Sequence, residues 1–449
     1  MKSQDSSNHL DIAGRALDFA MQAGADAADV VVVGGHALSA RVRLGALEGV
    51  ERSEDRDLGL RVFSGKSHAI VATCELDDAS LRKSADLCLE MAKVAPEDPF
   101  DGLAESVGSG GPAESLDLFD STSPSAADLE ADAQAAEAAA LEVSGVTNSN
   151  GASAGHQVST ILLATSNGFS GSYSRSSFSR SCGVLAGEGT AMESDYDYSM
   201  KVHREDLDAP DKIGRTAGER AVRRLGGRKM PTQQVPVVYH PRVASQLVSN
   251  FAGAISGSSI SRGASFLKDR LGDQVFAKAI SIIDDPRLCR GHRSRPFDAE
   301  GLTGEMMRLI EEGSLTSWIL DSRTARQLGL ESNGRASRGH SSGPAPSATN
   351  LYMAAGEVSP EDLIADIKAG FLVMGLMGRG GSVVTGDYSE GANGYWIENG
   401  EIAHPVSEVT IASNLKDMFL NMSPANDLEF RGAVNAPTLR VEGMTVAGS

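Results

Sequence analysis

The sequence contains little of what marks an exported or membrane-bound protein. Its four cysteines, Cys74, Cys88, Cys182 and Cys289, are scattered without CxxC spacing, a pattern typical of reduced and mostly buried thiols. No segment approaches the roughly 18 consecutive apolar residues that cross a membrane. The first ten residues are polar and lack the apolar centre of a signal peptide. We therefore expect a cytoplasmic protein without membrane contacts.

Positive charge is also scarce. The 41 lysines and arginines are outnumbered by 60 aspartates and glutamates, so the formal net charge is −19. Proteins that bind nucleic acids normally cluster Lys and Arg against the phosphate backbone. The most basic stretch, residues 215–229, is predicted to be a charged helix face and the turn after it. Direct binding of nucleic acid is therefore not expected.

The length of 449 residues is too great for one ordinary core, so two or three folding units are expected. The pattern predicts an α+β protein. An N-terminal α+β subdomain covers residues 8–95, and a central α+β subdomain covers residues 125–228. Between them, residues 96–124 form a linker or loop, with the Gly- and Ser-rich residues 108–112 at its centre. Residues 229–449 form a larger, β-rich C-terminal domain with antiparallel sheet.

Several short patterns predict individual elements. A glycine turn at Gly65 closes a β-hairpin, and a second hairpin turns at Asn399-Gly400. Asp77 or Asp78 can cap the helix that follows them. Pro241 is well placed in the first turn of another helix.

Other segments carry weaker patterns. Residues 29–33 are predicted to be a short buried strand, and residues 280–283 and 315–320 are strand-like. The Ala- and Glu-rich residues 126–143 are expected to be helical. Residues 147–203 alternate small, polar and aromatic side chains, which favours several antiparallel strands.

Residues 385–408, with residues 409–418 after them, resemble one family closely, the TldD/PmbA proteins, also called modulators of DNA gyrase or TldE. Further blocks that resemble the family are residues 53–65, residues 295–330 and the closing residues 439–448. Within the family the chain is most similar to the PmbA (TldE) branch, because it lacks the zinc motif of the TldD branch.

The resemblance implies an α+β fold with two N-terminal subdomains and a larger C-terminal β-rich domain. It also implies a cytoplasmic TldD–TldE heterodimer, or a homodimer in some members, that degrades or trims unfolded peptides. In such a complex the TldD-like partner supplies the zinc, and the PmbA-like subunit closes the chamber around it.

The segment that matches the zinc helix of the TldD branch is residues 243–252, Val-Ala-Ser-Gln-Leu-Val-Ser-Asn-Phe-Ala. It contains none of the His, Glu or Cys side chains of an HExxH-type site. None of the nine histidines stands three to five residues from another, so no local ligand pair exists. His240, just before this segment, is expected to hydrogen-bond locally. We expect neither a metal nor a catalytic residue in this chain.

Five residues are candidates for a substrate groove or a partner loop. Asp298 and Glu300 could orient a substrate amine or a metal-bound water, although the pattern favours a solvated turn. Gly386, Asp387 and Tyr388 follow a glycine-rich stretch that lacks the order of a phosphate-binding loop. They could line a groove, or Asp387 could simply bond its own turn.

Three functions remain open at this point. The first is a non-catalytic subunit of a zinc-dependent peptidase complex. The second is a stand-alone peptide-binding or regulatory protein that acts on gyrase-related partners. The third is an independent metallopeptidase with an unrecognised site. The absent zinc helix separates the first two from the third, and an HExxxH sister protein in the same cell would separate the first from the second.

Overall fold

The computed structural model describes residues 2–105, 114–378 and 380–448. The centre of the predicted linker, residues 108–112, lies outside these ranges. Within them, no helix has both the length and the apolar character needed to cross a membrane.

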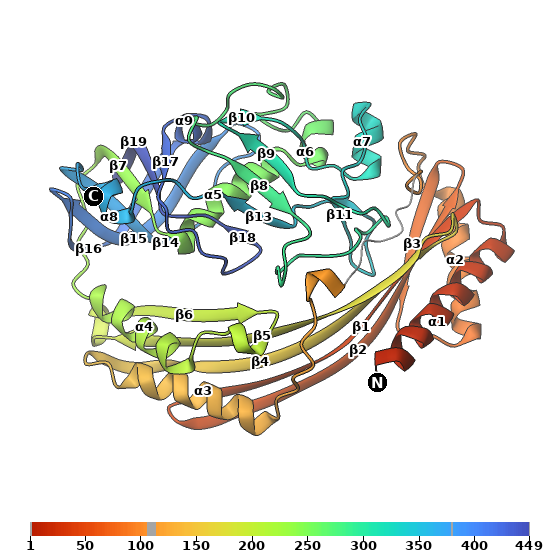
Figure 1. Ribbon diagram of the computed structural model, residues 1–449, viewed down its shortest axis with the longest axis horizontal. Helices are drawn as coiled ribbons and strands as arrows, with labels where there is room; N and C mark the ends of the chain where they lie inside the picture. The colour runs from red at the N-terminus through yellow and green to blue at the C-terminus, as the bar shows by residue number, and fades with distance from the viewer. Residues whose placement is uncertain (1, 106–113, 379, 449) are drawn as a thin grey trace.

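A six-stranded antiparallel sheet forms the N-terminal half of the molecule (Figure 1). Its strand order is β3-β2-β1-β4-β5-β6. The strands are β1 (Ala27–Arg43), β2 (Ala46–Ser64), β3 (Ser67–Thr73), β4 (Val146–Thr165), β5 (Ser170–Ala186) and β6 (Glu193–Lys201). Because β1 pairs with β4 over fourteen residues, one continuous sheet runs through both predicted N-terminal subdomains.

Helices cover one face of this sheet from end to end. Alternate residues of a strand point to the same face, so Val30 and Val32 share a face with Ala40 and Val42. The first two belong to a core with α1 (Lys2–Ala23) and α2 (Asp78–Val94), and the second two to a core with α3 (Ala126–Leu141) and α4 (Pro210–Arg223). The opposite, concave face is turned toward the C-terminal domain (Figure 1).

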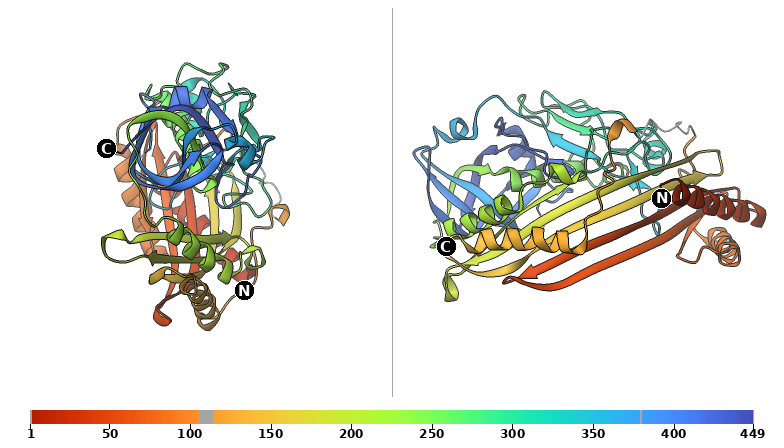
Figure 2. Two further views of the ribbon diagram at one scale, coloured as in Figure 1. Left: turned by 90° about the vertical axis from the view of Figure 1, so that its left-hand side faces the viewer. Right: turned by 60° about the horizontal axis from the view of Figure 1, so that its bottom comes forward.

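The C-terminal domain is built on a closed barrel, seen end-on in the left view of Figure 2. Its strands follow the order β16-β15-β14-β7-β19, and a pairing of β16 with β19 closes the ring. The short β17 lies beside β19. These strands are β7 (Gln233–Tyr239), β14 (Ala369–Met377), β15 (Asp387–Glu398), β16 (Glu401–Asn414), β17 (Met422–Pro424) and β19 (Leu439–Ala447).

A second, five-stranded sheet lies beside the barrel, in the order β10-β9-β8-β13-β18. Helix α5 (Pro241–Ala254) shares one hydrophobic core with both sheets, and Phe251, Phe276 and Phe419 meet in it. The remaining elements are β8 (Ile282–Asp285), β9 (Met307–Glu311), β10 (Ser314–Leu315), β11 (Ala336–Ser337), β12 (Ala345–Pro346), β13 (Asn350–Met353), β18 (Val434–Asn435), α6 (Gly257–Ser261), α7 (Ser322–Leu328), α8 (Pro360–Ile364) and α9 (Leu415–Leu420).

The short sequence signals are confirmed at the level of single residues. Gly65 turns between β2 and β3 with φ of 61°, and Asn399 and Gly400 turn between β15 and β16 with φ of 50° and 81°. Asp77 caps α2 by accepting the N–H groups of the second and third helical residues. Pro241 opens α5.

The longer expectations needed correction in two places. The strand expected at residues 29–33 extends over all seventeen residues of β1. Residues 315–320 are not a strand, because only Ser314 and Leu315 pair with β9.

Arginines of the C-terminal domain join it to the N-terminal half. The Arg338 guanidinium contacts Asp29 on the concave face of β1, and both side chains are buried. Arg290 contacts Asp117, Glu205 and Asp206. These ion pairs hold the C-terminal domain over the sheet.

Candidate functional site

A cavity of about 500 Å³ opens where the edge of the N-terminal sheet meets α5 and the barrel. Strand β6 and the end of α4 form one wall, while α5, β14 and β15 form the other. The lining is mostly polar and neutral, with paired charges at one side. It consists of Ser194, Asp195, Tyr196, Arg224, Arg242, Val243, Ser245, Gln246, Ser249, Met374, Gly375, Leu376 and Asn393.

Strand β6 contributes a regular alternation of Asp and Tyr. Asp195 and Asp197 are buried, whereas Tyr196 and Tyr198 are 53% and 39% exposed. This separation follows from the two-residue period of a strand, which sends alternate side chains to opposite faces. Arg242 of α5 binds Asp195 at 2.7 Å and lies over the Tyr196 ring, 4.6 Å from its centroid.

The start of α5 is fixed by His240. Its Nδ1 accepts a hydrogen bond from the Arg242 backbone N–H at 3.3 Å, so the local role expected for this histidine is confirmed. Burial, together with the nearby Arg220 and Arg242 charges, lowers the pKa of His240 to about 4. The ring is therefore a neutral cap at physiological pH.

The face of α5 toward the cavity presents Val243, Ser245, Gln246 and Ser249. Gln246 Nε2 donates to the buried Glu390 Oε1 at 2.9 Å. Burial raises the pKa of Glu390, while the Gln246 hydrogen bond lowers it in part. The Gln246 amide therefore hydrogen-bonds the Glu390 carboxylate, and Gln246 also lines the cavity.

Zinc does not fit this face of α5. Zinc sites in proteins are built from Cys, His and carboxylate ligands, and the cavity side of α5 offers one apolar, two hydroxyl, one amide and one guanidinium side chain. Across residues 2–105, 114–378 and 380–448, no group of three or more His, Cys, Asp or Glu side chains is arranged to hold a metal ion. The arrangement offers neutral hydrogen-bond donors and acceptors that can bind polar main chain.

Asp298 and Glu300 lie elsewhere, in the loop before β9, and they are not a solvated turn. They are 2% and 6% exposed. Asp298 accepts the N–H groups of Glu300, Leu302 and Ala336, so it ties its own turn to β11. Glu300 accepts the N–H and hydroxyl of Ser322. The expectation of solvated carboxylates is therefore wrong, because donors of their own turn and of the distant residues Ser322 and Ala336 surround them.

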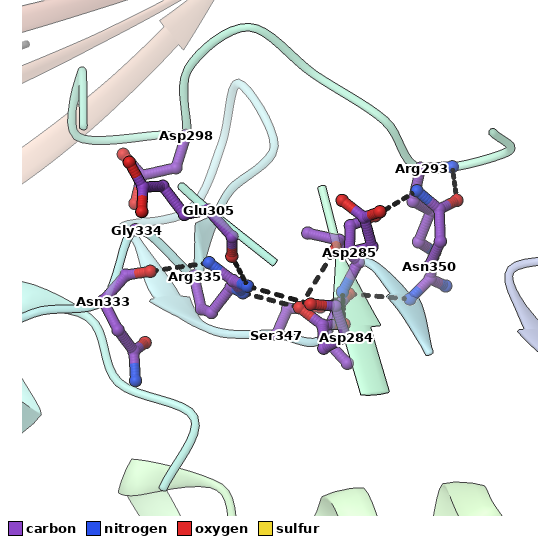
Figure 3. Close-up of polar contacts among 12 residues, drawn as sticks. Asp284, Asp285, Arg293, Asp298, Glu305, Asn333, Gly334, Arg335, Ser347 and Asn350 are labelled. Atoms are coloured by element: carbon purple, nitrogen blue, oxygen red, sulfur yellow. Dashed lines mark hydrogen bonds and ion pairs between the residues drawn. The ribbon is translucent and has the colours of Figure 1, made fainter. Parts of the chain in front are cut away.

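Asp298 lies near a buried polar network (Figure 3). Arg335 contacts Asp284 at its centre and also donates to the carbonyls of Asn333 and Glu305. Asn350 binds the Asp285 carbonyl at 2.6 Å in the same region. This network holds loops of the C-terminal domain together, and its members supply one another's hydrogen-bond partners.

Gly386, Asp387 and Tyr388 lie at the start of β15 and do not line the cavity. Gly386 has φ of 88°, and Asp387 accepts from Thr385 Oγ1 and from Asn414 at 2.7 and 3.1 Å. Tyr388 is buried against Tyr239, and burial raises its pKa. The structure therefore brings these three together with one another but separates them from Asp298 and Glu300.

The cavity residues were missed by reasoning from the sequence. One signal was present, the run Asp195-Tyr-Asp-Tyr198, because alternating carboxylates and phenols in a strand place each type on its own face. The pairing of Asp195 with Arg242 had no local signal, since these residues come from separate domains.

Family models match the chain in three consecutive parts. They are the PmbA/TldA metallopeptidase domain 1 at residues 28–92, the central domain at residues 119–225 and the C-terminal domain at residues 232–448. The metalloprotease PmbA homolog of Haemophilus influenzae is 35% identical over 441 residues, covering 97% of this chain and 95% of that protein. The chain belongs to the PmbA/TldD family. The metalloprotease PmbA of Escherichia coli O157:H7 is also 35% identical, over 94% of this chain and 92% of its own length.

Solved structures share the fold over the whole or nearly the whole chain. A candidate modulator of DNA gyrase from Bacteroides thetaiotaomicron superposes with a TM-score of 0.91 at 26% identity, with both chains covered completely. TldE from Thermococcus kodakarensis gives a TM-score of 0.85 at 19% identity, over 97% of this chain and 100% of that chain. The α+β class with a β-rich C-terminal domain is confirmed, and the chain is a metalloprotease-like member of its family.

Proposed function

We propose that this chain is the TldE-like, metal-free subunit of a two-subunit zinc metallopeptidase that degrades or trims unfolded peptides in the cytoplasm. A TldD-like partner supplies the zinc, and this subunit contributes a wall of the chamber. The observation that carries the proposal is the helix α5, which borders a 500 Å³ cavity with Ser245, Gln246 and Ser249 instead of metal ligands.

The chemistry of the cavity supports a peptide as the ligand. Serine hydroxyls and the amides of Gln246 and Asn393 offer neutral donors and acceptors, which match the N–H and C=O groups of any polypeptide. Recognition through main-chain groups tolerates many side-chain sequences. Of the two arginines in the lining, Arg242 pairs with Asp195, and Arg224 pairs with Glu193 and Asp195, so the cavity presents little uncompensated charge.

The test compares the chain alone with the chain mixed with its TldD-like sister. Bound zinc per chain and hydrolysis of casein are measured in each sample. We expect zinc and cleavage only in the mixture, and loss of both when the sister's HExxxH motif is mutated. Zinc-dependent cleavage by this chain alone would contradict the proposal. Tight peptide binding without cleavage in the mixture would favour a stand-alone binding protein.

A further inference from the structure

Arg175 of β5 lies on the concave face of the N-terminal sheet. Its partner across the sheet is Ser159 of β4, which pairs in turn with Gly35 of β1, an even number of residues from Asp29. Residues opposite one another in a sheet share a face, and so do residues two apart along a strand. Arg175 therefore faces the C-terminal domain, as Asp29 does, and Ser159 and Ser177 lie beside it on the same face.

The half-buried Arg175 guanidinium has no carboxylate partner in the part of the chain that the structure describes. One of its nitrogens donates to the His292 carbonyl of the C-terminal domain. On the opposite face of the same strand, by contrast, Arg180 pairs with Asp132 at 2.9 Å. The chain has 60 acidic residues for 41 lysines and arginines, so a lack of acidic residues does not explain why Arg175 is unpaired.

Two more cations near Arg175 are held in the same way. Arg293 follows His292 in the loop before β9, is exposed, and donates to the Ala348 carbonyl at 3.5 Å. Lys201, at the end of β6, donates to the Phe430 carbonyl at 2.9 Å. Among the described residues, neither cation forms an ion pair with a carboxylate. A neutral carbonyl satisfies a donor but does not cancel its charge.

The charges of this cluster act on one another. Burial, and then the charges of Lys201 and Arg175, lowers the pKa of His292 to about 4. Burial also lowers the pKa of Arg175, Tyr173 raises it in part, and the charge of Arg293 lowers it again. Cations that leave solvent are normally paired with an anion. Three cations around one neutral histidine therefore indicate a place for an anionic ligand.

We propose that Arg175 binds a carboxylate of the peptide substrate, and that Arg293 and Lys201 add positive charge around it. The inference rests on the proposed function, because it names the class of peptide that this subunit selects, one with an acidic side chain or a free C-terminal carboxylate. A guanidinium group fits a carboxylate with two parallel hydrogen bonds, and Ser159 and Ser177 offer hydroxyl donors beside it. Only one Arg175 nitrogen is engaged by the described residues, so the others are available.

The carboxylate site is separate from the 500 Å³ cavity, whose lining does not include Arg175. Gly183, further along β5, pairs with Tyr196 of the cavity wall. Eight residues of strand separate Gly183 from Arg175, which corresponds to about 26 Å. One extended peptide can therefore reach both places, with its polar main chain at the cavity and its carboxylate at Arg175.

The test measures peptide affinity of the full-length chain alone, without zinc and without the sister subunit. Three labelled, unfolded peptides of about sixteen residues are long enough to span both places. The first has Glu near each end and an amidated C-terminus, so that either chain direction presents a carboxylate. The second has Gln at both positions and is also amidated. The third has Gln at both positions and a free C-terminal carboxylate.

Fluorescence anisotropy gives the affinity of each peptide for the wild type and for Arg175→Met. Methionine keeps the aliphatic stem and removes the charge and the donors. Arg270→Met is the matched control, because it removes one positive charge from an exposed pair with Asp273. It separates binding at Arg175 from the effect of the net charge.

We expect the wild type and the control to bind at least one carboxylate peptide roughly tenfold more tightly than the neutral peptide, since a charge-assisted hydrogen bond is gained. Arg175→Met should bind all three peptides alike. A gain with the first peptide assigns the site to acidic side chains, and a gain with the third assigns it to the chain end. Equal affinities in the wild type, or a gain that persists in Arg175→Met, would overturn the proposal.

Melting temperatures separate a ligand-binding arginine from a structural one. Because Arg175 leaves no carboxylate unpaired when it is replaced, we expect Arg175→Met to keep or raise the melting temperature. A clear fall would make Arg175 a structural residue and overturn the proposal. The comparison of the three peptides with the wild type needs no variant and decides the matter if Arg175→Met does not fold.

The same titrations distinguish the inference from the proposed function. Wild-type protein that binds all three peptides equally contradicts the carboxylate site alone. Failure to bind any of them contradicts the peptide chamber and the carboxylate site together. The zinc-dependent hydrolysis of the mixture is measured separately and does not enter either result.

Discussion

The Arg335 guanidinium and the Asp284 carboxylate form an ion pair inside the C-terminal domain, with 2.5 Å between Nε and Oδ2 and only 1% of each side chain exposed. Asp284 also accepts the N–H and hydroxyl of Thr349. The pair thus links β8 to the segments next to β11 and β13. The Asp284 carboxylate has hydrogen-bond partners from both segments, Arg335 and Thr349.

Removing one member of this pair is expected to destabilise the protein strongly. Arg335→Met leaves the Asp284 charge buried without its cation, which costs about 3–5 kcal/mol. Urea unfolding followed by circular dichroism measures the change in the free energy of unfolding. Arg270→Met is the control, since Arg270 pairs with Asp273 at the surface, and exposed pairs contribute about 1 kcal/mol or less. Similar losses in the two variants would contradict this account.

Glu300 makes stability depend on pH. Burial, and then the charge of Asp298, raises its pKa from 4.5 to about 7. The folded protein therefore holds a proton that the unfolded chain releases, so this contribution is complete below pH 4.5 and is lost as pH rises through about 7. Glu300→Gln should remove that loss. Melting temperatures of both proteins between pH 4.5 and 8 test this, and parallel curves would refute it.

The turn between β15 and β16 should not tolerate a side chain at Gly400. Its φ is 81°, and an added Cβ would lie 2.5 Å from the Ala365 carbonyl oxygen. We expect Gly400→Ala to lower the free energy of unfolding by about 1–3 kcal/mol. Gly432→Ala, where a Cβ meets nothing within 4 Å, is the matched control and should be nearly neutral. Denaturant titrations of both variants give the comparison.

The four thiols should separate into two classes. Cys74 and Cys289 are exposed, while Cys88 and Cys182 are buried, so the expectation of mostly buried thiols holds for only half of them. Burial raises the pKa of Cys88 to about 11 and that of Cys182 to about 12, and the thiolate is the reactive form. Labelling with a thiol reagent at pH 8 should modify two cysteines in the folded protein and four in urea. Rapid modification of all four before unfolding would contradict the burial.

The exposed Tyr196 ring should matter for peptide binding but not for stability. Tyr196→Ala removes a 53% exposed ring at the cavity wall, and we expect a several-fold loss of affinity for an unfolded peptide. The melting temperature should stay within about 1–2 °C of the wild type, because surface substitutions change stability by about 0.5 kcal/mol or less. Anisotropy and calorimetry measure the two effects. A large fall in melting temperature would show that the ring is structural.

Much of the local structure could be predicted because its causes lie within a few residues. Asn399-Gly400 supplies the two positive φ angles that the turn requires, and Pro241 supplies the φ of a first helical turn. The full length of β1 could not be predicted. Gly34, Gly35 and His36 interrupt its apolar run, and only pairing with β2 and β4 on both sides keeps the chain extended there.

The candidate site was less accessible to such reasoning. Glu300 looks solvated in the sequence, but its partner Ser322 is 22 residues away. Arg242 and Asp195 are 47 residues apart and belong to different domains. Glu300 meets Ser322, and Arg242 meets Asp195, only in the folded chain, because no local sequence pattern predicts either contact. The absence of metal ligands in α5, by contrast, is a property of one helix and could be read directly from its residues.

The barrel cannot close until its last strand, β19, has been synthesised. Strand β19, residues 439–447, lies between β7 and β17 and also pairs with β16. Its neighbour β7 leaves the ribosome about 200 residues earlier, at residues 233–239, which takes on the order of 10–40 s at typical rates of synthesis. For that time the N-terminal sheet can be complete while β7 has no β19 to pair with. A nascent chain is then most exposed to misassembly along β7 and, once residues 401–414 have been made, along β16, and a chaperone that protects it should act on those strands.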